Sequence, residues 1–436
     1  MIGRNRTQAY RKHWRTTVKR AKGCERFHAG APWLLPATAL VALLAGACGS
    51  GDGAITADIV VHDSAGVVVV ENPGDLWSLP ERWTLSDEPL VSIGLADGAE
   101  PYLLDGVRGV VPLGDGRVLV ANSGDRTLRW YDADGEFLFQ RGGEGGGPGE
   151  FDQLGGVALG LADTIMAVDW SARRLSVFTS DGTLAGTRPI QGLTGPPGSV
   201  YRLPDGSMVT GVSGFSTAQL GDDISSGRVR LDSPLLRLSA DGTGVDTIGM
   251  FPGEDIQIMV FDQGMWFGGA VYGKRMSYAS SGEAVYVGTQ DAFVIDVYSP
   301  AGQLVRSIRA LETPVLSGPN LRADWNAFTR ERLADVPPQE RAEAERDAAQ
   351  TELPASAPAY AEFVTDDEGN LWVAEYRVGG SAPEKWVVFN AEGRVLTTVA
   401  VPESFRIMAV RQGRVFGRSS DEWGVQRVVG YALGKG

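Results

Sequence analysis

The sequence predicts an all-β fold made of six repeated sheets, and three observations lead to this prediction. Short apolar runs recur along the chain with turn-forming residues between them. The turns fall into two series that alternate along the chain. Glycine is abundant, with 58 residues in a chain of 436, and this suits many tight turns between strands better than a helical bundle.

The first turn series has six members, and a strand-like run follows each of them directly. They are Asp115-Gly116, Ala162-Asp163, Asp205-Gly206, Ser281-Gly282, Glu368-Gly369 and Gln412-Gly413. The second series has five members, and each of them comes after a strand-like run. These are Asp134-Gly135, Asp181-Gly182, Asp241-Gly242, Ala301-Gly302 and Glu392-Gly393. Four strands per unit, with one series joining the first two and the other joining the last two, make the blade of a β-propeller.

Six turns of the first series and five of the second leave the sixth blade one strand short. The segment from Trp83 to Gly94 ends in Val-Ser-Ile-Gly, much like Asp246 to Gly249 at the end of blade three. We therefore predict a six-bladed β-propeller closed by an N-terminal strand, because this segment would complete blade six and remove two open sheet edges. An open sandwich of the same strands is the alternative.

Residues 1–47 have the organisation of a secretory leader. Nine Lys and Arg stand against one acidic residue, and an apolar run follows from Ala31 to Ala47, short for a membrane-spanning helix. Its end resembles the lipobox of bacterial lipoproteins, in which small residues precede a cysteine that becomes lipidated. This chain departs from that pattern with Ala45, where Leu is usual. We expect a signal peptide over 1–47 and lipid on Cys48; an uncleaved anchor with an incidental cysteine is the alternative.

The small polar residues 48–57 are predicted to be a flexible tether, and 58–436 to be the propeller. Because Gly49 rather than Asp follows the cysteine, resemblance to sorted lipoproteins implies attachment to the outer membrane of the bacterial cell envelope. Removing the leader's excess of eight positive charges from the whole-chain value of −14 leaves −22 beyond it. Such a body repels phosphate backbones, so nucleic acid is excluded as a partner.

The few cysteines and histidines exclude several kinds of catalytic and metal site. Cys24 and Cys48 are the only cysteines, so the mature domain has neither a disulfide nor a Cys-rich metal site. The three histidines are His13, His28 and His62, and all of them precede the first blade. No Ser-His-Asp triad or His-ligated zinc site can therefore form inside the propeller.

The second blade carries a resemblance to a known group. A glycine loop leads into it (Gly145 to Phe151), one strand ends in Met166-Ala167-Val168-Asp169, and the next reads Arg174 to Phe178 (RLSVF). These segments resemble the glycine loop and paired strands of six-bladed propellers of the NHL-repeat type and their bacterial lipoprotein relatives. The match is good over 107–190 and poor over 191–275. The resemblance implies a fold but no particular activity, because propellers host many.

The long connections are predicted to gather on one face. They are 141–151, 212–233, 254–275 and 312–357. All of them lie between the second and third strands of a blade or between blades, and both kinds of connection lie at the same end of a propeller. Insertions on one face of a repeat protein usually mark its binding surface.

The insertion 312–357, between blades four and five, is predicted to be helical. Leu321, Trp325, Phe328 and Leu333 have near-helical spacing, and Pro337-Pro338 starts a charged second helix. Packing of the Trp325 and Phe328 stripe on the propeller rim is the commoner role of such a stripe, and direct ligand contact is the other possibility. The pair Trp266-Phe267 leaves the same two options.

Polar residues end the second strands of the blades and point toward this face. The candidate binding residues are Asn122, Asp169, Trp170, Thr289, Asp291, Glu375 and Arg418, together with Trp325 and Phe328. Asp169, Asp291 and Glu375 could ligate Ca²⁺ through oxygen, as the resemblance to gluconolactonase-like six-bladed enzymes implies. The more common role of Asp or Asn at a strand end is to cap the next turn, so no cofactor is expected.

Three functions remain open from the sequence. The favoured one is a non-catalytic envelope protein that binds a small molecule or a protein partner through its insertion-bearing face. The second is a Ca²⁺-dependent hydrolase or lactonase with carboxylates at the same face. The third is a scaffold subunit of an envelope complex. The membrane is expected to be a partner only through the lipid anchor.

Overall fold

The computed structural model describes residues 58–436 except 194, 196, 213–216, 221–223, 262–263 and 381. Within this range the chain is mostly β-structure with two α-helices, α2 (Gly318–Arg332) and α3 (Pro338–Gln350). Thr329–Thr351, which hold the end of α2 and all of α3, form a unit separate from the rest. The predicted leader 1–47, the lipidation site Cys48 and the tether 48–57 lie outside the described residues.

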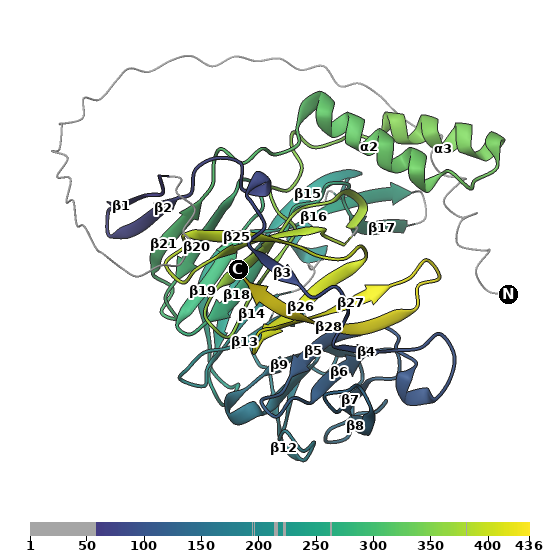
Figure 1. The fold of residues 1–436 in the computed structure, drawn as a ribbon. Helices are drawn as coiled ribbons and strands as arrows, with labels where there is room; N and C mark the ends of the chain where they lie inside the picture. The colour runs from purple at the N-terminus through teal and green to yellow at the C-terminus, as the bar shows by residue number, and fades with distance from the viewer. Residues whose placement is uncertain are drawn as a thin grey trace. The chain divides into compact units, whose positions relative to one another are not determined.

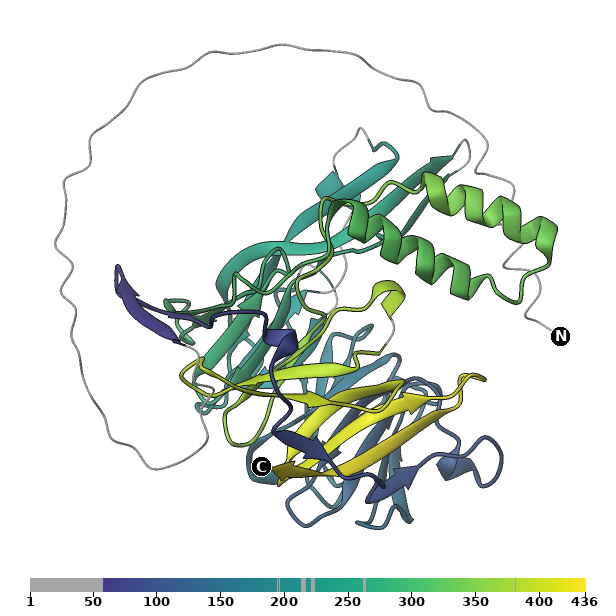
Figure 2. The same cartoon turned by 45° about the horizontal axis from the view of Figure 1, so that its top comes forward.

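The larger unit contains six sheets, shown in Figures 1 and 2. The first consists of β5 (Val107–Pro112), β6 (Val118–Asn122), β7 (Thr127–Tyr131) and β8 (Phe137–Gly142), and the second of β9 (Leu154–Leu159), β10 (Ile165–Asp169), β11 (Arg174–Phe178) and β12 (Leu184–Pro189). The third has β13 (Pro197–Arg202), β14 (Met208–Val212), β15 (Gly227–Leu238), β16 (Val245–Phe261) and β17 (Gly264–Gly269).

The fourth sheet has β18 (Ser277–Ser281), β19 (Ala284–Gly288), β20 (Val294–Tyr298) and β21 (Leu304–Arg309), extended by β2 (Val67–Glu71) and β1 (Val60–Ser64). The fifth has β22 (Phe363–Thr365), β23 (Leu371–Ala374), β24 (Lys385–Phe389) and β25 (Val395–Ala400). The sixth has β26 (Phe405–Arg411), β27 (Arg414–Ser420) and β28 (Gln426–Lys435), with β3 (Trp83–Leu85) and β4 (Val91–Ile93) on its outer edge. Short 3₁₀ helices are Leu76–Ser78, Glu100–Tyr102, Leu161–Asp163, Thr217–Leu220 and Val378–Gly380.

Both turn series lie where the sequence predicts them. Each turn of the first series joins the first two strands of a sheet, and each turn of the second joins the last two of the main four. The turn between β7 and β8 shows why: Gly135 has a φ of 89°, which suits glycine, and the Asp132 carboxylate accepts the backbone N–H groups of Asp134 and Glu136 at 3.0 and 2.8 Å.

Burial within a sheet explains the strand sequences. The middle strand β6 (VLVAN) is buried at every residue because neighbouring sheets cover both of its faces, whereas the outer strand β8 alternates half-buried and exposed residues at its start. The innermost strand of each sheet contacts the innermost strand of the next, and β26 also contacts β5. Sheets built around four antiparallel strands and related in this way are the organisation of a β-propeller.

A separate apolar cluster lies between each pair of consecutive sheets. A further one lies between the sixth sheet and the first, where Val428 and Phe416 pack with Val107 and Tyr131. Val91 and Ile93 of β4 belong to this last cluster and are 4% and 0% exposed. Apolar burial therefore joins the ends of the chain as well as neighbouring sheets.

The N-terminal segment runs along three sheets. β2 pairs in parallel with β21, the Thr398 hydroxyl on the fifth sheet donates to the Leu79 carbonyl at 2.9 Å, and β3 and β4 pair antiparallel with β28. In β4, Ser92 lies opposite Val429. The sequence indicates the pairing with the sixth sheet but not the β1–β2 hairpin on the fourth.

Two of the predicted long connections are wrong in part. Much of 212–233 and 254–275 is strand, because β15 begins at Gly227, β16 continues to Phe261, and β17 adds a further strand. The sequence does not predict the start of β15, because Arg228 and Arg230 are typical of a solvent-exposed loop. In the structure they form ion pairs with Asp255 and Asp291. The helical insertion agrees with the prediction, since α2 and α3 both lie within 312–357.

Candidate functional site

The candidate site lies where the innermost strands begin. Arg108 is the second residue of β5 and Arg406 the second of β26, while Glu362 directly precedes β22 and Arg275 stands two residues before β18. A cavity of about 580 Å³ is lined by residues of the third to sixth sheets, including Arg275, Glu362 and Arg406. Its size is typical of sites for small molecules.

Two arginines share one carboxylate in this cavity. The Arg406 guanidinium forms a two-point ion pair with Glu362, with Nε 2.6 Å from Oε1 and Nη2 on Oε2. Arg275 approaches the same Oε2 at 3.4 Å. The hydrogen bonds that Arg406 donates to Glu362 raise the pKa of Arg406, so this guanidinium is held in place and charged.

Two further arginines lie beside this group. Arg418 on β27 donates to the Val107 carbonyl at 3.3 Å, and burial together with the positive charges of Arg406 and Arg108 lowers its pKa. Arg108 lies over the Trp170 ring at 5.2 Å, and both residues line a smaller cavity of about 360 Å³. Within the described part of the chain, neither Arg108 nor Arg418 forms an ion pair.

The other walls of the larger cavity are aromatic and acidic. Tyr201 and Tyr278 meet edge to face with ring centroids 5.8 Å apart, and the Tyr278 hydroxyl donates to the Ser199 carbonyl at 2.8 Å. Burial raises the pKa of Tyr201, so its hydroxyl stays neutral. Asp232 on β15 and Glu254 on β16 complete the lining.

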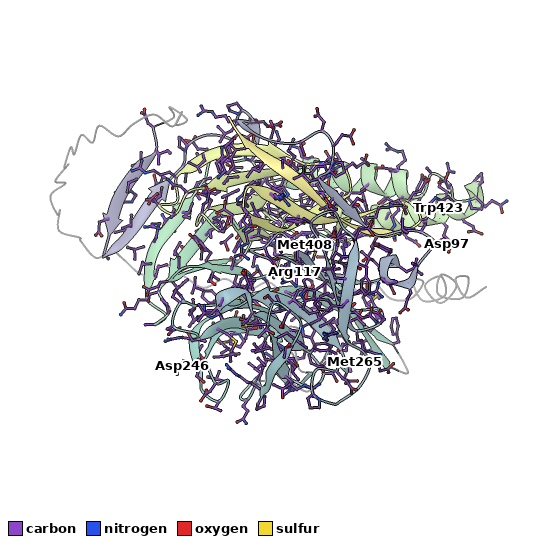
Figure 3. The ribbon with its side chains drawn as sticks, turned by 60° about the horizontal axis from the view of Figure 1, so that its bottom comes forward. Asp97, Arg117, Asp246, Met265, Met408 and Trp423 are labelled. Atoms are coloured by element: carbon purple, nitrogen blue, oxygen red, sulfur yellow. The ribbon has the colours of Figure 1, made fainter. Side chains whose placement is uncertain are left out.

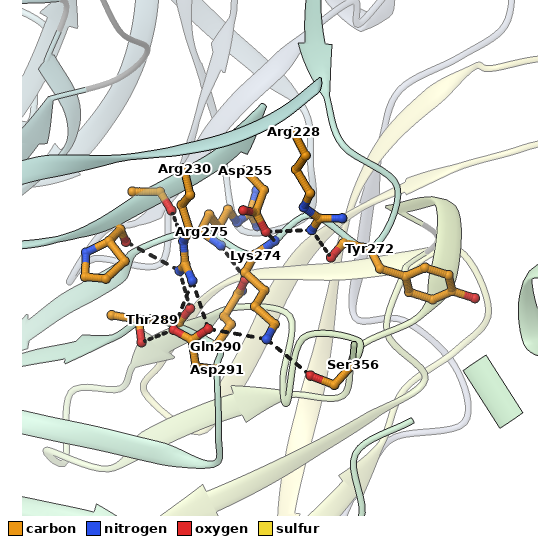
Figure 4. A network of polar contacts seen from close by, with 12 residues as sticks. Arg228, Arg230, Asp255, Tyr272, Lys274, Arg275, Thr289, Gln290, Asp291 and Ser356 are labelled. Atoms are coloured by element: carbon orange, nitrogen blue, oxygen red, sulfur yellow. Dashed lines mark hydrogen bonds and ion pairs between the residues drawn. The ribbon is translucent and has the colours of Figure 1, made fainter. Parts of the chain in front are cut away.

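A polar network holds the extension of β15 and β16 against the fourth sheet, as Figure 4 shows. Arg230 places Nη1 2.9 Å from both carboxylate oxygens of Asp291, which also accepts from Thr289 Oγ1 at 2.8 Å and Lys274 Nζ at 3.3 Å. Burial raises the pKa of Asp291, but the Thr289 hydrogen bond and the cations outweigh it, and the pKa is lowered overall. Nearby, Arg228 pairs with Asp255 at 2.6 Å.

Asn122 and Asp169 cap their strand ends. Asp169 is fully buried and accepts the backbone N–H groups of Asp152, Gln153 and Ala172 at 2.9, 3.2 and 3.1 Å. Asn122 accepts from the Asp105 N–H at 2.7 Å and donates to the Asp125 carboxylate. These oxygens serve the turns, which is the common role of Asp and Asn at such positions.

The predicted calcium ligands do not gather. Asp169 is the last residue of β10 in the second sheet, Asp291 lies three residues beyond β19 of the fourth, and Glu375 directly follows β23 of the fifth. Among residues 58–436, where described, no three His, Cys, Asp or Glu side chains are grouped as they would be around a metal ion. Glu375 is half-buried, and desolvation raises its pKa despite the charges of Lys385 and Arg377.

The aromatic stripe of α2, formed by Trp325 and Phe328, belongs to the larger unit and packs within it. Trp325 lies 6.4 Å from Tyr272 and 5.8 Å from Phe328, measured between ring centroids. The Tyr272 hydroxyl donates to Asp324 at 2.6 Å, and Leu321 is buried in the same apolar cluster. Packing, the commoner role of such a stripe, accounts for these contacts.

Trp423, which is labelled in Figure 3, lies in the connection between β27 and β28 and is 84% exposed.

The sequence indicates only part of the site. The sequence predicts Arg418 and Trp170 as binding residues, and these lie beside Arg406 and Arg108. It does not predict four other residues of the site, which are Arg108, Arg275, Glu362 and Arg406. A usable signal exists for two of them, since a charged second residue is unusual in an innermost strand with an apolar middle, such as β5 (VRGVVP) or β26 (FRIMAVR).

No family model matches the chain, and no curated protein matches it in sequence. Among solved structures, a member of the duf4221 family from Bacteroides vulgatus is 12% identical, with 82% of this chain and 99% of that chain covered and a TM-score of 0.49. A candidate exported protein from Bacteroides fragilis is 12% identical, with coverages of 84% and 99% and a TM-score of 0.47. A gluconolactonase from Xanthomonas campestris is 13% identical, with coverages of 76% and 88% and a TM-score of 0.40.

Changing Glu375→Gln should stabilise the protein at neutral pH. Burial raises the pKa of Glu375 in the folded state, so the folded protein holds the Glu375 proton more tightly than the unfolded chain does. The stability that this proton contributes is complete below the unfolded pKa of about 4.3 and is lost as pH rises through the folded pKa. The free energy of unfolding in urea, measured from pH 4 to 8, should show an advantage of the variant that grows with pH. The exposed Glu403→Gln is the control. An advantage independent of pH would contradict this assignment.

Proposed function

We propose that this chain is an envelope lipoprotein with a non-catalytic β-propeller, which binds a small molecule or a protein partner through its insertion-bearing face. The observation that carries the proposal is the cavity of about 580 Å³ at the start of the innermost strands, bordered by the β15–β16 extension. It brings together aromatic rings, carboxylates and guanidinium groups. A concave site with a few convergent polar groups is the usual form of a ligand-binding pocket.

The proposal includes a ring of six blades of the NHL-repeat type, closed by the N-terminal segment. The contact between β26 and β5 and the apolar cluster between the sixth and first sheets support closure. The glycine loop before β9 supports the NHL resemblance, since Gly145 donates to the Phe151 carbonyl at 3.2 Å and the Phe151 side chain is fully buried. Closure would give the cavity a rigid rim, which favours binding.

The proposed location is the outer membrane, with the signal peptide 1–47 removed, lipid on Cys48 and a tether over 48–57. The support comes from the lipobox-like end of the leader. None of the helices in the described part of the chain has the length and apolar character that a membrane span requires.

Changing Cys48→Ser should release the protein from the membrane, because it removes the proposed acylated side chain. Membrane and soluble fractions of a Gram-negative host that expresses the chain, separated by centrifugation, would show this. Cys24→Ser is the matched control and should leave the protein in the membrane fraction. A Cys48→Ser protein that remains membrane-bound after its leader is cleaved would overturn the anchor.

Filling the cavity should abolish ligand binding without unfolding the protein. Ser199 lines the cavity and is exposed, so Ser199→Trp adds bulk there; Thr183→Trp adds the same bulk in an exposed turn between β11 and β12. Low-molecular-weight fractions of an envelope extract should raise the melting temperature of the wild type and of Thr183→Trp, but not of Ser199→Trp.

Mass spectrometry of the active fraction should recover the compound unchanged after prolonged incubation with the protein. Conversion of the compound, dependent on added Ca²⁺, would replace the binding function by the lactonase-like one. Equal stabilisation of Ser199→Trp would place binding away from the cavity.

A further inference from the structure

The larger cavity has two walls of opposite charge. Arg406 and Arg275 line it from the sixth sheet and from the segment before the fourth, with Glu362 between them. Asp232 and Glu254 line it from β15 and β16 of the third sheet. In the proposed ring of six sheets the third and the sixth stand opposite each other, so the sheet that bears Arg406 is opposite the sheet that bears Asp232 and Glu254.

The basic wall keeps an excess of positive charge. Among the described residues, Glu362 is the one carboxylate paired with Arg406 and Arg275. Arg418 and Arg108 stand beside this wall, outside the lining of the larger cavity, and form no ion pair in the same part of the chain. Arg406 and Arg108 act on Arg418 with like charge. An anionic group placed here would relieve that repulsion and accept hydrogen bonds from guanidinium groups.

The acidic wall is unpartnered. Neither Asp232 nor Glu254 forms an ion pair or a side-chain hydrogen bond within the described part of the chain, although both line the cavity. Their neighbours Arg228 and Arg230 are engaged by Asp255 and Asp291. An ammonium group of a ligand would therefore meet two carboxylates that no protein cation neutralises.

We infer that the cavity takes a dipolar ligand of short-peptide size, with its carboxylate at Arg406 and Arg275 and its ammonium group at Asp232 and Glu254. Tyr201, Tyr278 and Phe267 line the cavity and supply aromatic surface for the middle of the ligand. The inference rests on the proposed binding function and names the class of ligand. The two ends of such a molecule would each meet protein charge of the opposite sign, which favours it over a molecule with a single charge.

Four forms of one tripeptide test the inference. The probe is alanyl-tyrosyl-alanine, used with both ends free, with the amino end acetylated, with the carboxyl end amidated, and with both ends blocked. Calorimetric titration of the purified wild-type lipoprotein in detergent at low salt should give the tightest binding for the free peptide. Each blocked end should weaken binding by tenfold or more, and added salt should reduce the difference.

Two variants test which residues of the cavity bind the carboxyl end and the amino end of the peptide. Arg406→Gln should weaken binding of peptides with a free carboxylate at least tenfold and leave the amidated forms unchanged. Asp232→Asn should do the same for peptides with a free amino end. Arg275→Gln, whose side chain is 47% exposed, replaces Arg406→Gln if that protein unfolds at a lower urea concentration. Arg117→Gln is the control, because Arg117 pairs locally with Asp115 beside the β5–β6 turn (Figure 3).

Equal affinity for all four peptides, equal weakening of all four by either variant, or no binding of any form at millimolar concentration would overturn the inference. These results leave the proposed function standing if an uncharged compound still stabilises the wild type and fails to stabilise Ser199→Trp. If no compound distinguishes the wild type from Ser199→Trp, the proposed function itself fails.

Discussion

The pairing of β4 with β28 is the interaction on which the rest of the structure depends. Without it the last sheet would have three strands and an open edge, and Val91 and Ile93 would leave the apolar cluster that joins the sixth sheet to the first. Burying two such side chains contributes about 3–6 kcal/mol, a large share of the stability of an ordinary domain. The described residues contain no cysteine, so non-covalent contacts join the two ends of the fold: hydrogen bonds, apolar packing and the Lys435 ammonium group over the Trp83 ring.

The candidate site depends on the same constraint. Arg406 stands on β26 of the sixth sheet and Arg108 on β5 of the first, and these strands are neighbours only because the first and last sheets meet. The acidic wall, formed by Asp232 and Glu254, lies on the β15–β16 extension. Ion pairs of Arg228 and Arg230 hold this extension in place. The two charged walls of the cavity are therefore positioned by separate sets of contacts.

The repeat was predictable because the turns between its strands contain residues, above all Asp and Gly, that favour tight turns in any sheet. Asp-Gly pairs fix the turn conformation locally, so they can be found without knowing what the strands contact. The arginine group was not predictable, because its members lie far apart in the sequence and meet only through the packing of whole sheets. The β15–β16 extension was not predictable for a related reason. Arg228 and Arg230 indicate a solvent-exposed segment, and their partners Asp255 and Asp291 are known only from the structure.

The most direct test is a disulfide across the β4–β28 pair. Ser92 lies opposite Val429, and the Leu90 N–H donates to the Gly430 carbonyl at 2.8 Å, so cysteines at 92 and 429 are in register. In a Cys24→Ser background the account predicts that Ser92→Cys with Val429→Cys crosslinks on oxidation and unfolds at a higher denaturant concentration, whereas Ser92→Cys with Arg427→Cys does not crosslink. Failure of the in-register pair to form, with the protein folded, would contradict the account.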